Sequence, residues 1–249
     1  LSKSPFSPSP SPPFMRISVV IPVYNEAGHI LELLNYLAPL LKADGSTECL
    51  IVDAQSPDGT AGLIHRSAPD FSVLQSPKKG RAAQMNYGAA QSTGELLYFL
   101  HADSFPPKDV FRQLRAAVRA GANSGCYRLR FDDNRPVMRL YAWFTRFDLL
   151  PFRYGDQSLF VSREAFRAVG GFREDLVVME DNEIVRLLRK RGGFQLLQED
   201  VVTSARKYHE NGFLRLQIIF SIIFVLYYAG ASQDVLVQFY RDMIRGAKQ

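Results

Sequence analysis

Ile17-Ser18-Val19-Val20-Ile21-Pro22-Val23 is the stretch of this chain that decides its fold, and Tyr24-Asn25-Glu26 follows it directly. The run is rich in Ile and Val without alternation, which is typical of a strand covered on both faces in a parallel sheet. Apolar residues then recur at helical spacing from Ile30 to Leu41. A strand, a polar turn and a helix in this order indicate the first unit of an α/β fold.

The alternation of strand and helix continues through the first half of the chain. Further strands are expected at 48–53, 71–74 and 95–100, with helices at 60–67 and 81–91 between them. A chain of 249 residues with 47% hydrophobic residues is long enough for one large domain with a buried core. We therefore expect a single α/β domain with a mostly parallel, Rossmann-like sheet flanked by helices, followed by a C-terminal helical extension.

Both ends of the chain are expected to lie outside the core. Residues 1–14 are almost entirely Ser, Pro, Phe and Lys, a composition that cannot bury a core, so we predict a disordered leader there. Met15 directly precedes the first strand and is a candidate natural start. We assign 15–104 to a nucleotide-binding half, 105–210 to an acceptor half and 211–249 to C-terminal helices.

Charge and cysteine usage narrow the functional class. The formal net charge is +5 and the isoelectric point is about 9.2, which favours anionic partners such as nucleotide phosphates or acidic lipids. Nucleic acid is not an expected partner, because the charges are dispersed and no recognition signature is present. Cys49 and Cys126 lie far apart in apolar stretches, as in reduced cytoplasmic proteins. The glycine-rich signatures of dehydrogenases and kinases are absent.

Polar residues gather where three of the expected strands end. The segments are Pro22-Val23-Tyr24-Asn25-Glu26, the run 53–60 that begins Asp53-Ala54-Gln55, and His101-Ala102-Asp103-Ser104. Ligands of open parallel sheets bind beyond the carboxyl ends of the strands, so these segments are the expected site. Two further motifs, Gly155-Asp156-Gln157 and Met179-Glu180-Asp181, follow in the second half.

In order and spacing these motifs, together with Gly80-Arg81-Ala82, resemble those of the family 2 glycosyltransferases, which have the GT-A fold. The resemblance covers residues 17 to about 208, and small bacterial members with Gly-Arg-Ala, His-Ala-Asp and Gly-Asp-Gln variants are similar. It implies an inverting enzyme that moves a hexose from a nucleoside diphosphate, with UDP favoured, to an acceptor. Some similar proteins are named for glycosylating lipid or carotenoid acids, so a lipid or isoprenoid acceptor is attractive.

The first two strand ends offer groups that suit a nucleoside. Tyr24 can stack on a base, and the carboxylate of Glu26 can accept hydrogen bonds from ribose hydroxyls. The resemblance implies that Asp53 binds the base, where it would accept the imide N–H of uracil. The predicted nucleotide-sugar site also includes Pro22, Val23, Gln55, His101 and Ala102. A plain strand-to-helix turn, with Glu26 as a first-turn acid, is the alternative.

The diphosphate is expected to meet cationic side chains and a metal ion. Arg81 precedes a helix, where its side chain and free backbone N–H groups suit phosphate, and Arg206 is expected to approach the same group. Negative charge that develops on a departing diphosphate is neutralised by a divalent cation, for which Asp103 is the candidate ligand.

The expected metal site departs from the family pattern. Family members typically show Asp-x-Asp here, whereas this chain has His101-Ala102-Asp103, and the usual aspartate pair of the second motif is Asp53-Ala54. Mg²⁺ prefers oxygen ligands and Mn²⁺ tolerates His101 more readily, so Mn²⁺ or Mg²⁺ is expected. A packed His101 that binds no metal is the alternative.

The second half carries the acceptor side and the expected base. The resemblance places Gly155, Asp156 and Gln157 on the acceptor side and makes Asp181 the catalytic base, with Glu180 beside it. A carboxylate opposite the leaving diphosphate can take the proton of an acceptor hydroxyl in a single displacement. The alternative is that both acids only stabilise the start of a helix.

An apolar run near the C-terminus, 216–231, is broken only by Gln217 and Ser221. As a helix it would be about 24 Å long, short of the roughly 30 Å hydrocarbon core of a bilayer, so it is not expected to span. Arg215 and Tyr227-Tyr228 near its ends are typical of interface anchors. They favour a helix that lies on the cytoplasmic face of a membrane or on a partner subunit. Burial in the core is the alternative.

Two other functions remain open from the sequence. A nucleotidyltransferase on a similar scaffold would release pyrophosphate, whereas a glycosyltransferase releases a nucleoside diphosphate. A catalytically inactive nucleotide-binding module is the other, because carboxylates are missing at Ala54 and His101.

Overall fold

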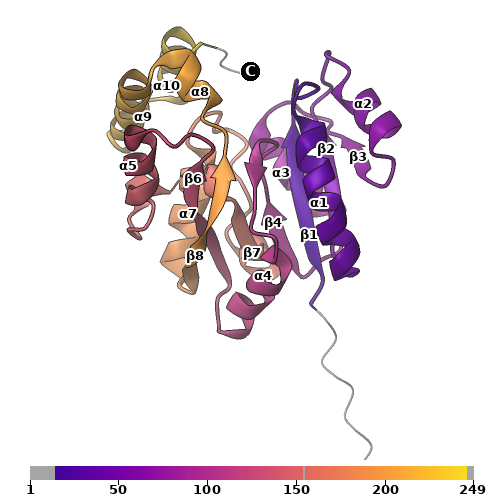
Figure 1. Ribbon diagram of the computed structural model, residues 1–249. Coiled ribbons are helices and arrows are strands. Elements are labelled where there is room, and N and C mark those ends of the chain that lie inside the picture. The colour runs from indigo at the N-terminus through magenta and orange to yellow at the C-terminus, as the bar shows by residue number, and fades with distance from the viewer. Residues whose placement is uncertain (1–14, 154, 246–249) are drawn as a thin grey trace, which may run out of the picture.

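The computed structural model describes residues 15–153 and 155–245 (Figure 1). The strands are β1 Ile17–Val23, β2 Glu48–Asp53, β3 Ser72–Gln75, β4 Leu96–Phe99, β5 Ser104–Phe105, β6 Ser124–Phe131, β7 Leu159–Ser162 and β8 Phe194–Thr203. The helices are α1 Ile30–Asp44, α2 Thr60–Ser67, α3 Arg81–Gln91, α4 Val110–Arg119, α5 Pro136–Phe144, α6 Arg163–Ala168, α7 Glu180–Arg191, α8 Arg206–Asn211, α9 Phe213–Tyr228 and α10 Gln233–Met243. Two short 3-10 helices, η1 Leu150–Phe152 and η2 Gly155–Gln157, lie before β7. The predicted leader, 1–14, lies outside the described residues.

The elements expected in the first half are confirmed. β1, β2, α2 and α3 have the predicted bounds, while β3 begins one residue later than expected and β4 is shorter by one residue at each end. Every residue of β1 is buried, because the strand lies between β2 and β4 and is covered on both faces. This position explains the absence of alternation in its sequence.

The sheet is mixed, although most of its pairs are parallel. The strand order is β3-β2-β1-β4-β7-β6-β8-β5. β1 runs parallel to β2 and β4, β2 to β3, and β6 to β8, whereas β7 is antiparallel to both of its neighbours and β5 is antiparallel to β8. The expectation of a mostly parallel α/β sheet flanked by helices is therefore confirmed, with antiparallel insertions in the second half.

Helices cover both faces of the sheet (Figure 1). Alternate side chains of β1 point to opposite cores: Val19 and Ile21 pack with α1, α2 and α4, and Val20 packs with α3, α6 and α7. The carboxyl ends of β1, β2 and β4 thus emerge together between two helical layers, which positions the loops that follow them side by side.

The C-terminal helices form a third core against β6 and α5. α9 buries Leu216, Ile219 and Ile223 in it, but Leu214 and Val225 on its other side are 69% and 64% exposed. The helix is therefore partly a core helix and partly an exposed apolar one. Along the stretches that the structure describes, every helix is too short or too polar to cross a bilayer.

Tyr227, Tyr228 and Arg215 were expected to anchor α9 at a membrane interface. Their polar ends instead form hydrogen bonds within the protein. The hydroxyl of Tyr227 donates to Glu183 Oε2 at 3.0 Å, and that of Tyr228 donates to Asn182 Oδ1 at 2.7 Å. Arg215 donates from Nη2 to the carbonyl of Met243 at 2.7 Å. These bonds tie α9 to α7 and to the end of α10.

Candidate active site

Two neighbouring loops at the carboxyl end of the sheet are tied together. In the loop after β1, the N–H of Glu26 donates to Thr60 Oγ1 at 3.0 Å and the N–H of Ala27 donates to Asp58 Oδ2 at 3.0 Å. Asp58 also accepts the N–H of Thr60 at 3.0 Å, which fixes the first turn of α2. The first two strand ends consequently form one connected edge, in which Asp58 acts as scaffold.

Asp53 ends β2 and is only 1% exposed. Its carboxylate accepts the N–H of Ser56 at 3.1 Å and also the hydroxyl of Ser56. Gln55 lies between them with a φ of 61°, a left-handed conformation that marks a tight turn. The carboxylate predicted to bind a base therefore also holds its own loop.

Gln84 of α3 braces the ends of β1 and β2 from within the core. Its Nε2 donates to the carbonyl of Val23 at 2.8 Å and to that of Val52 at 2.7 Å. Pro22 and Val23 are buried in β1, and Tyr24 just beyond them is half-buried. Of the residues predicted to bind the sugar nucleotide in this segment, Pro22 and Val23 can therefore contact a ligand only through their backbone. Tyr24 is the first whose side chain is accessible.

Three side chains from two distant segments meet beyond the end of β4. His101, Asp103 and Asp156 each offer one ligand atom, and these atoms all lie within 4.8 Å of one another. His101 Nδ1 and Asp156 Oδ1 are 2.8 Å apart, while Ala102 between the first two residues is buried. Imidazole and carboxylate groups suit Mn²⁺, and the carboxylates suit Mg²⁺. The trio thus fits a divalent cation, with Asp156 in the role of the carboxylate that the His101 motif lacks.

The trio is electrostatically coupled. Burial works against a charged His101, but its hydrogen bond to Asp156 and the charge of Asp181 raise the pKa of the imidazole above its usual value. Burial likewise works against a charged Asp156, yet the bond to His101 and the charge of Lys207 hold the pKa of this carboxyl below its usual range. Burial and the charge of Asp156 raise the pKa of Asp103. A cation between the two carboxyl groups would favour the ionised form of both.

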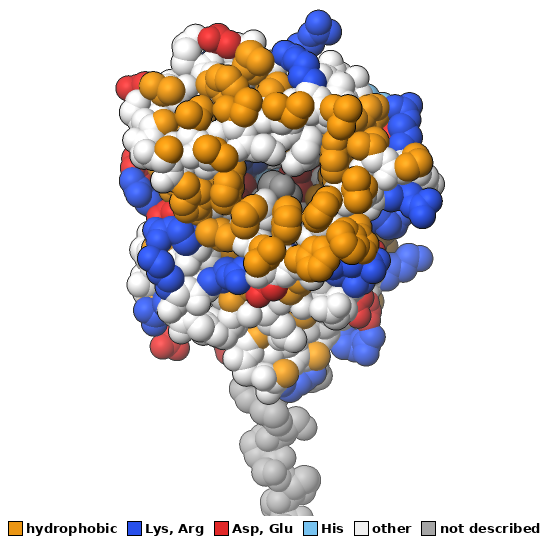
Figure 2. Space-filling model, turned by 90° about the vertical axis from the view of Figure 1, so that its left-hand side faces the viewer, with side chains coloured by type: hydrophobic (Ala, Val, Ile, Leu, Met, Phe, Trp, Pro, Cys, Tyr) orange, Lys and Arg blue, Asp and Glu red, His pale blue; other side chains and the backbone are white. Residues whose placement is uncertain are grey.

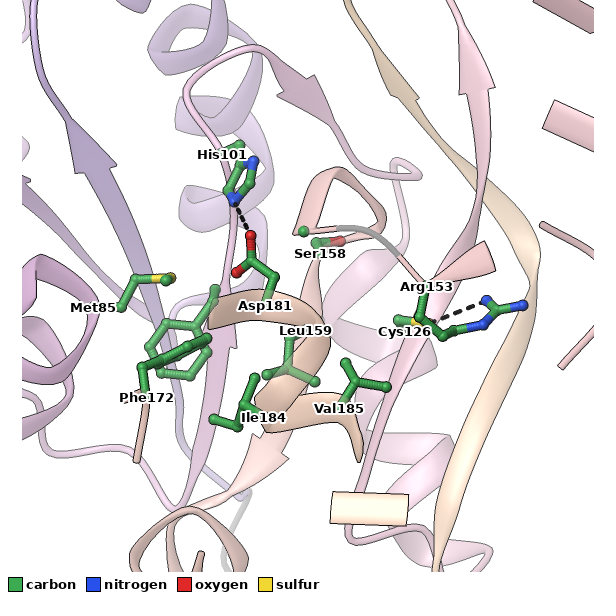
Figure 3. A pocket seen from close by; sticks show the side chains of 12 residues that line it. Met85, His101, Cys126, Arg153, Ser158, Leu159, Phe172, Asp181, Ile184 and Val185 are labelled. Atoms are coloured by element: carbon green, nitrogen blue, oxygen red, sulfur yellow. Dashed lines mark hydrogen bonds and ion pairs between the residues drawn. The ribbon is translucent and has the colours of Figure 1, made fainter. Parts of the chain in front are cut away.

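α7 begins with Glu180 and Asp181, as the sequence predicts, after Met179 with a left-handed φ of 74°. Asp181 Oδ2 points at His101 Nε2 and lies 4.0 Å from it (Figure 3). Arg81 Nε donates to Glu180 Oε1 at 2.6 Å, and Arg81 Nη2 lies 3.5 Å from Asp181 Oδ2. Arg81, which was expected to bind the phosphates, therefore partly neutralises the charges of Glu180 and Asp181.

The two acids differ in environment. Glu180 is 1% exposed, and burial together with the neighbouring Asp181 raises its pKa even though Arg81 opposes the shift. The side chain of Asp181 is 16% exposed. Of the two acids, Asp181 is therefore the one that a bound molecule can contact, while Glu180 is held by Arg81.

A glycine allows η2 to approach the acid and the histidine. A Cβ on Gly155 would lie 2.1 Å from Asp181 Oδ2 and 2.7 Å from His101 Cε1, closer than side-chain atoms can come. Gln157 at the other end of η2 is fully buried, and its Nε2 donates to the carbonyl of Tyr127 at 3.0 Å. Gly155 and Gln157 therefore build a wall of the site, and Asp156 between them turns its carboxylate to the histidine.

An apolar floor lies below His101 and Asp181. Met85, Phe172 and Ile184 line a narrow cavity beneath them (Figure 3). Apolar surroundings lower the local dielectric response, which strengthens electrostatic interactions between the groups above.

Arg206 borders a different cavity from the one beneath His101 and Asp181. It lines a wide open cavity of about 540 Å³ at the start of α8, together with Asp132, Arg135 and His209. The charge of its neighbour Lys207 is one of several that lower the pKa values of Asp103 and Asp156. Sequence reasoning missed Lys207 and the place of Asp156 beside His101. The position just after β8, which Arg206 shares, was the available signal.

Known proteins resemble this chain at the level of sequence. The model of glycosyl transferase family 2 matches residues 18–172, more than half of the chain. Glycosyltransferase AglE of Haloferax volcanii is 34% identical over 94 residues, which make up 36% of this chain and 31% of that protein. The dolichol-phosphate mannosyltransferase of Pyrococcus furiosus is 28% identical over 112 residues, 44% of this chain and 32% of that protein. The matches thus span about a third of the length of these curated relatives.

Solved structures share the fold. Mannosyltransferase PcManGT of Pyrobaculum calidifontis, in complex with GDP-Man and Mn²⁺, gives a TM-score of 0.65 at 21% identity and covers 99% of this chain and 69% of that one. S. aureus TarS 1-349 in complex with UDP-GlcNAc gives 0.63 at 17% identity, covering 92% and 71%. These likenesses confirm the GT-A type of fold. Together with the match over residues 18–172, they show that the chain belongs to glycosyl transferase family 2.

Proposed function

We propose that this chain is a glycosyltransferase that moves a hexose from a nucleoside diphosphate, UDP in the first place, to a hydroxyl group of a lipid-like acceptor. The observation that carries the proposal is that a carboxylate lies beside the candidate cation site. Asp181 Oδ2 is 4.0 Å from His101 Nε2, one of the three groups that could hold a cation. When a hydroxyl displaces a diphosphate, charge grows on the leaving group while a proton leaves the acceptor. A cation site beside a base serves both changes.

His101, Asp103 and Asp156 would hold the divalent cation, which when bound neutralises charge on the diphosphate. The imidazole among the ligands favours Mn²⁺ over Mg²⁺. The mannosyltransferase structure from Pyrobaculum calidifontis contains Mn²⁺, in support of this choice. Lys207, whose charge acts on both carboxylates, would contact the same phosphates.

The nucleoside is proposed to lie over the connected loops after β1 and β2. There Tyr24 would stack on the base, Glu26 would accept from the ribose, and Asp53 would accept the imide N–H of uracil. One solved relative binds UDP-GlcNAc and another binds GDP-Man, so the choice of UDP rests on Asp53.

Asp181 is proposed to take the proton of the acceptor in one direct displacement, which inverts the configuration of the sugar. Arg81 and Glu180 would hold it in place. Relatives named dolichol-phosphate mannosyltransferase and undecaprenyl-phosphate 4-deoxy-4-formamido-L-arabinose transferase support a lipid acceptor.

The proposal also assigns a part to each segment of the chain. Residues 15–104 would bind the donor and 105–210 the acceptor, within one catalytic unit on the cytoplasmic side of a membrane. Residues 211–249 would then contact the membrane in which a lipid acceptor lies.

A thermal-shift panel of UDP- and GDP-hexoses, with and without Mn²⁺, tests the donor site. Binding to the native state raises the melting temperature, so a UDP-hexose with Mn²⁺ should give the largest shift. Asp53→Ala should show no shift with or without Mn²⁺. Asp103→Asn should lose only the part of the shift that depends on Mn²⁺. Asp70→Asn, an exposed control, should give the wild-type shift under both conditions.

One outcome of this panel, and two outcomes of a turnover assay with the donor that it identifies, would contradict the proposal. The first is a wild-type shift in both site variants. The second is release of pyrophosphate during turnover, which would indicate a nucleotidyltransferase. The third is tight donor binding with no transfer or hydrolysis, which would indicate an inactive binding module.

A further inference from the structure

Exposed apolar side chains gather on one face of the molecule, around a hollow (Figure 2). One group follows α5 and the segment after it, where Leu140, Trp143, Phe147 and Leu149 are between 41% and 55% exposed. The other lies on α9 and α10 and includes Leu214, Ile218 and Val225. We call the two groups together the apolar face.

The two groups belong to one surface. α5 packs against α9 in a shared core, and the hydroxyl of Tyr141 on α5 donates to the carbonyl of Phe213 at the start of α9 at 3.4 Å. α5, α9 and α10 lie together at the left of Figure 1, the side that faces the viewer in Figure 2.

The outer side of α9 has no apolar partner among the described residues. Leu216, Ile219 and Ile223 are buried on its inner side, while Leu214, Ile218 and Val225 are exposed on the other. A helix that is apolar on both sides is normally covered on both. The exposed stripe therefore indicates an apolar partner outside the chain.

We propose that the apolar face is seated in the headgroup region of an anionic phospholipid bilayer, so that the site receives its acceptor from the lipid phase. This inference rests on the proposed function for its second part only. α9, with 16 residues, is about 24 Å long and would lie in the plane of the interface.

Charge complementarity favours a membrane as the partner. Lys and Arg side chains lie along both flanks of the apolar face (Figure 2). Arg139 and Arg146 are exposed, and neither forms an ion pair with a described residue. Anionic headgroups would neutralise them, whereas a symmetric contact with a second copy would bring arginines of like charge together.

The apolar face is also fixed to the first turn of the helix that carries the proposed base. Asn182, directly after Asp181, accepts the hydroxyl of Tyr228 from α9 at 2.7 Å. Its Nδ2 donates to the carbonyls of Leu150 and Arg153, at 3.0 and 3.2 Å, in the segment after α5. One side chain thus joins both apolar groups to the catalytic helix, so a bilayer under the face would have a fixed orientation relative to Asp181.

The chain provides its own probe, because Trp143 is its one tryptophan and is 46% exposed on the apolar face. The experiment titrates the full chain with phosphatidylcholine vesicles that contain or lack phosphatidylglycerol. We expect a blue shift of tryptophan emission and quenching by brominated lipid, both strongest with phosphatidylglycerol and weakened by salt. The double variant Ile218→Ser, Val225→Ser should bind vesicles about tenfold or more weakly, while Gln91→Ser, exposed on α3, should bind like wild type.

Folding and function are separated in the same experiment. Both substituted positions of the double variant are exposed, so its melting temperature should match that of wild type, and its turnover with a short water-soluble acceptor should be unchanged. If the wild-type protein showed no turnover with any soluble acceptor, the proposed function would be refuted. The result with vesicles would not be affected. No emission shift in wild type, or a shift that accompanies dimer formation without vesicles, would overturn the membrane proposal.

Discussion

At the scale of single residues, Gly155 sets the distance between the proposed base and the cation site. Gly155→Ala would bring a Cβ to 2.1 Å from Asp181 Oδ2, so the carboxylate of Asp181 or η2 has to shift. Displacement of a reacting group by about 1 Å costs roughly 10²-fold in rate, and we expect a loss of turnover of that order with a nearly unchanged melting temperature. Steady-state kinetics and thermal melting measure the two.

Gly62→Ala is the matched control for this substitution. The nearest atom to a Cβ at position 62 is the flexible Arg66 Nη1 at 3.3 Å, and the residue lies inside α2. Turnover should stay at the wild-type level and stability should rise by about 0.5 to 1 kcal/mol, because alanine is the better helix former. Equal activities of the two variants would show that Gly155 does not position Asp181.

The sequence predicts the places of residues that follow directly from a strand end, as with Asp53 at the end of β2 and Asp103 beyond β4, while their functions stay predictions. It does not predict that Asp156 contacts His101, because the two residues lie 55 positions apart and meet only when η2 folds back on β4. Arg206 and Lys207 could not be told apart for a related reason. Adjacent residues at a helix start point in different directions, and only the structure shows which one acts on the trio.

At the scale of elements, Gln84 couples α3 to the two strands that carry the donor loops. Gln84→Met keeps the side-chain size but leaves the carbonyls of Val23 and Val52 without their shared donor. The carbonyl of Val23 keeps the N–H of Ala54 as a donor at 3.2 Å. A lost hydrogen bond costs about 0.5 to 1.5 kcal/mol, so the loss of both bonds should lower the free energy of unfolding by about 2 kcal/mol. Urea denaturation measures it.

Gln91→Met on the same helix provides the comparison. Gln91 is exposed at the end of α3, and its substitution should change the free energy of unfolding by less than about 0.5 kcal/mol. A similar loss in both variants would mean that the buried amide of Gln84 does not brace the strands.

Local patterns fix the elements of the first half because each βαβ unit contains its own signals. β1, β2, α2 and α3 follow from unbroken Ile and Val runs and from helical spacing. β7 could not be placed in the same way. Its apolar sequence gives no direction, and its antiparallel position between β4 and β6 depends on the long excursion through α4, β6 and α5. The sequence also could not predict which side of α9 is exposed, since an apolar run does not show which of its residues are covered by other parts of the chain.

At the scale of the whole molecule, the Asp44–Arg115 pair makes stability depend on pH. Asp44 ends α1, Arg115 lies on α4, and Arg115 Nη2 is 3.0 Å from Asp44 Oδ2. Burial raises the pKa of Asp44, but the hydrogen bonds from Arg115 and from neighbouring hydroxyls lower it to about 2.

A carboxyl group with a lowered pKa stabilises the folded state above its unfolded pKa and loses this effect as pH falls through the folded value. Asp44→Asn should therefore cost about 1 to 2 kcal/mol at pH 7, with allowance for partial solvent screening, and the difference should shrink between pH 4 and about pH 2. Asp70→Asn, at an exposed position, should show no such dependence. A constant difference between wild type and Asp44→Asn at all pH values would refute the linkage.

The central claim is that Asp181 removes the acceptor's proton in a single inverting displacement, and the most direct test combines rate and stereochemistry. Asp181→Asn is assayed with the donor found in the thermal-shift panel, beside Asp175→Asn as an exposed control. We expect turnover to fall by about 10² to 10⁴ with donor binding unchanged, and wild-type product to have the anomeric configuration opposite to that of the donor by NMR. Near-normal turnover of Asp181→Asn, or a product that keeps the donor's configuration, would contradict the claim.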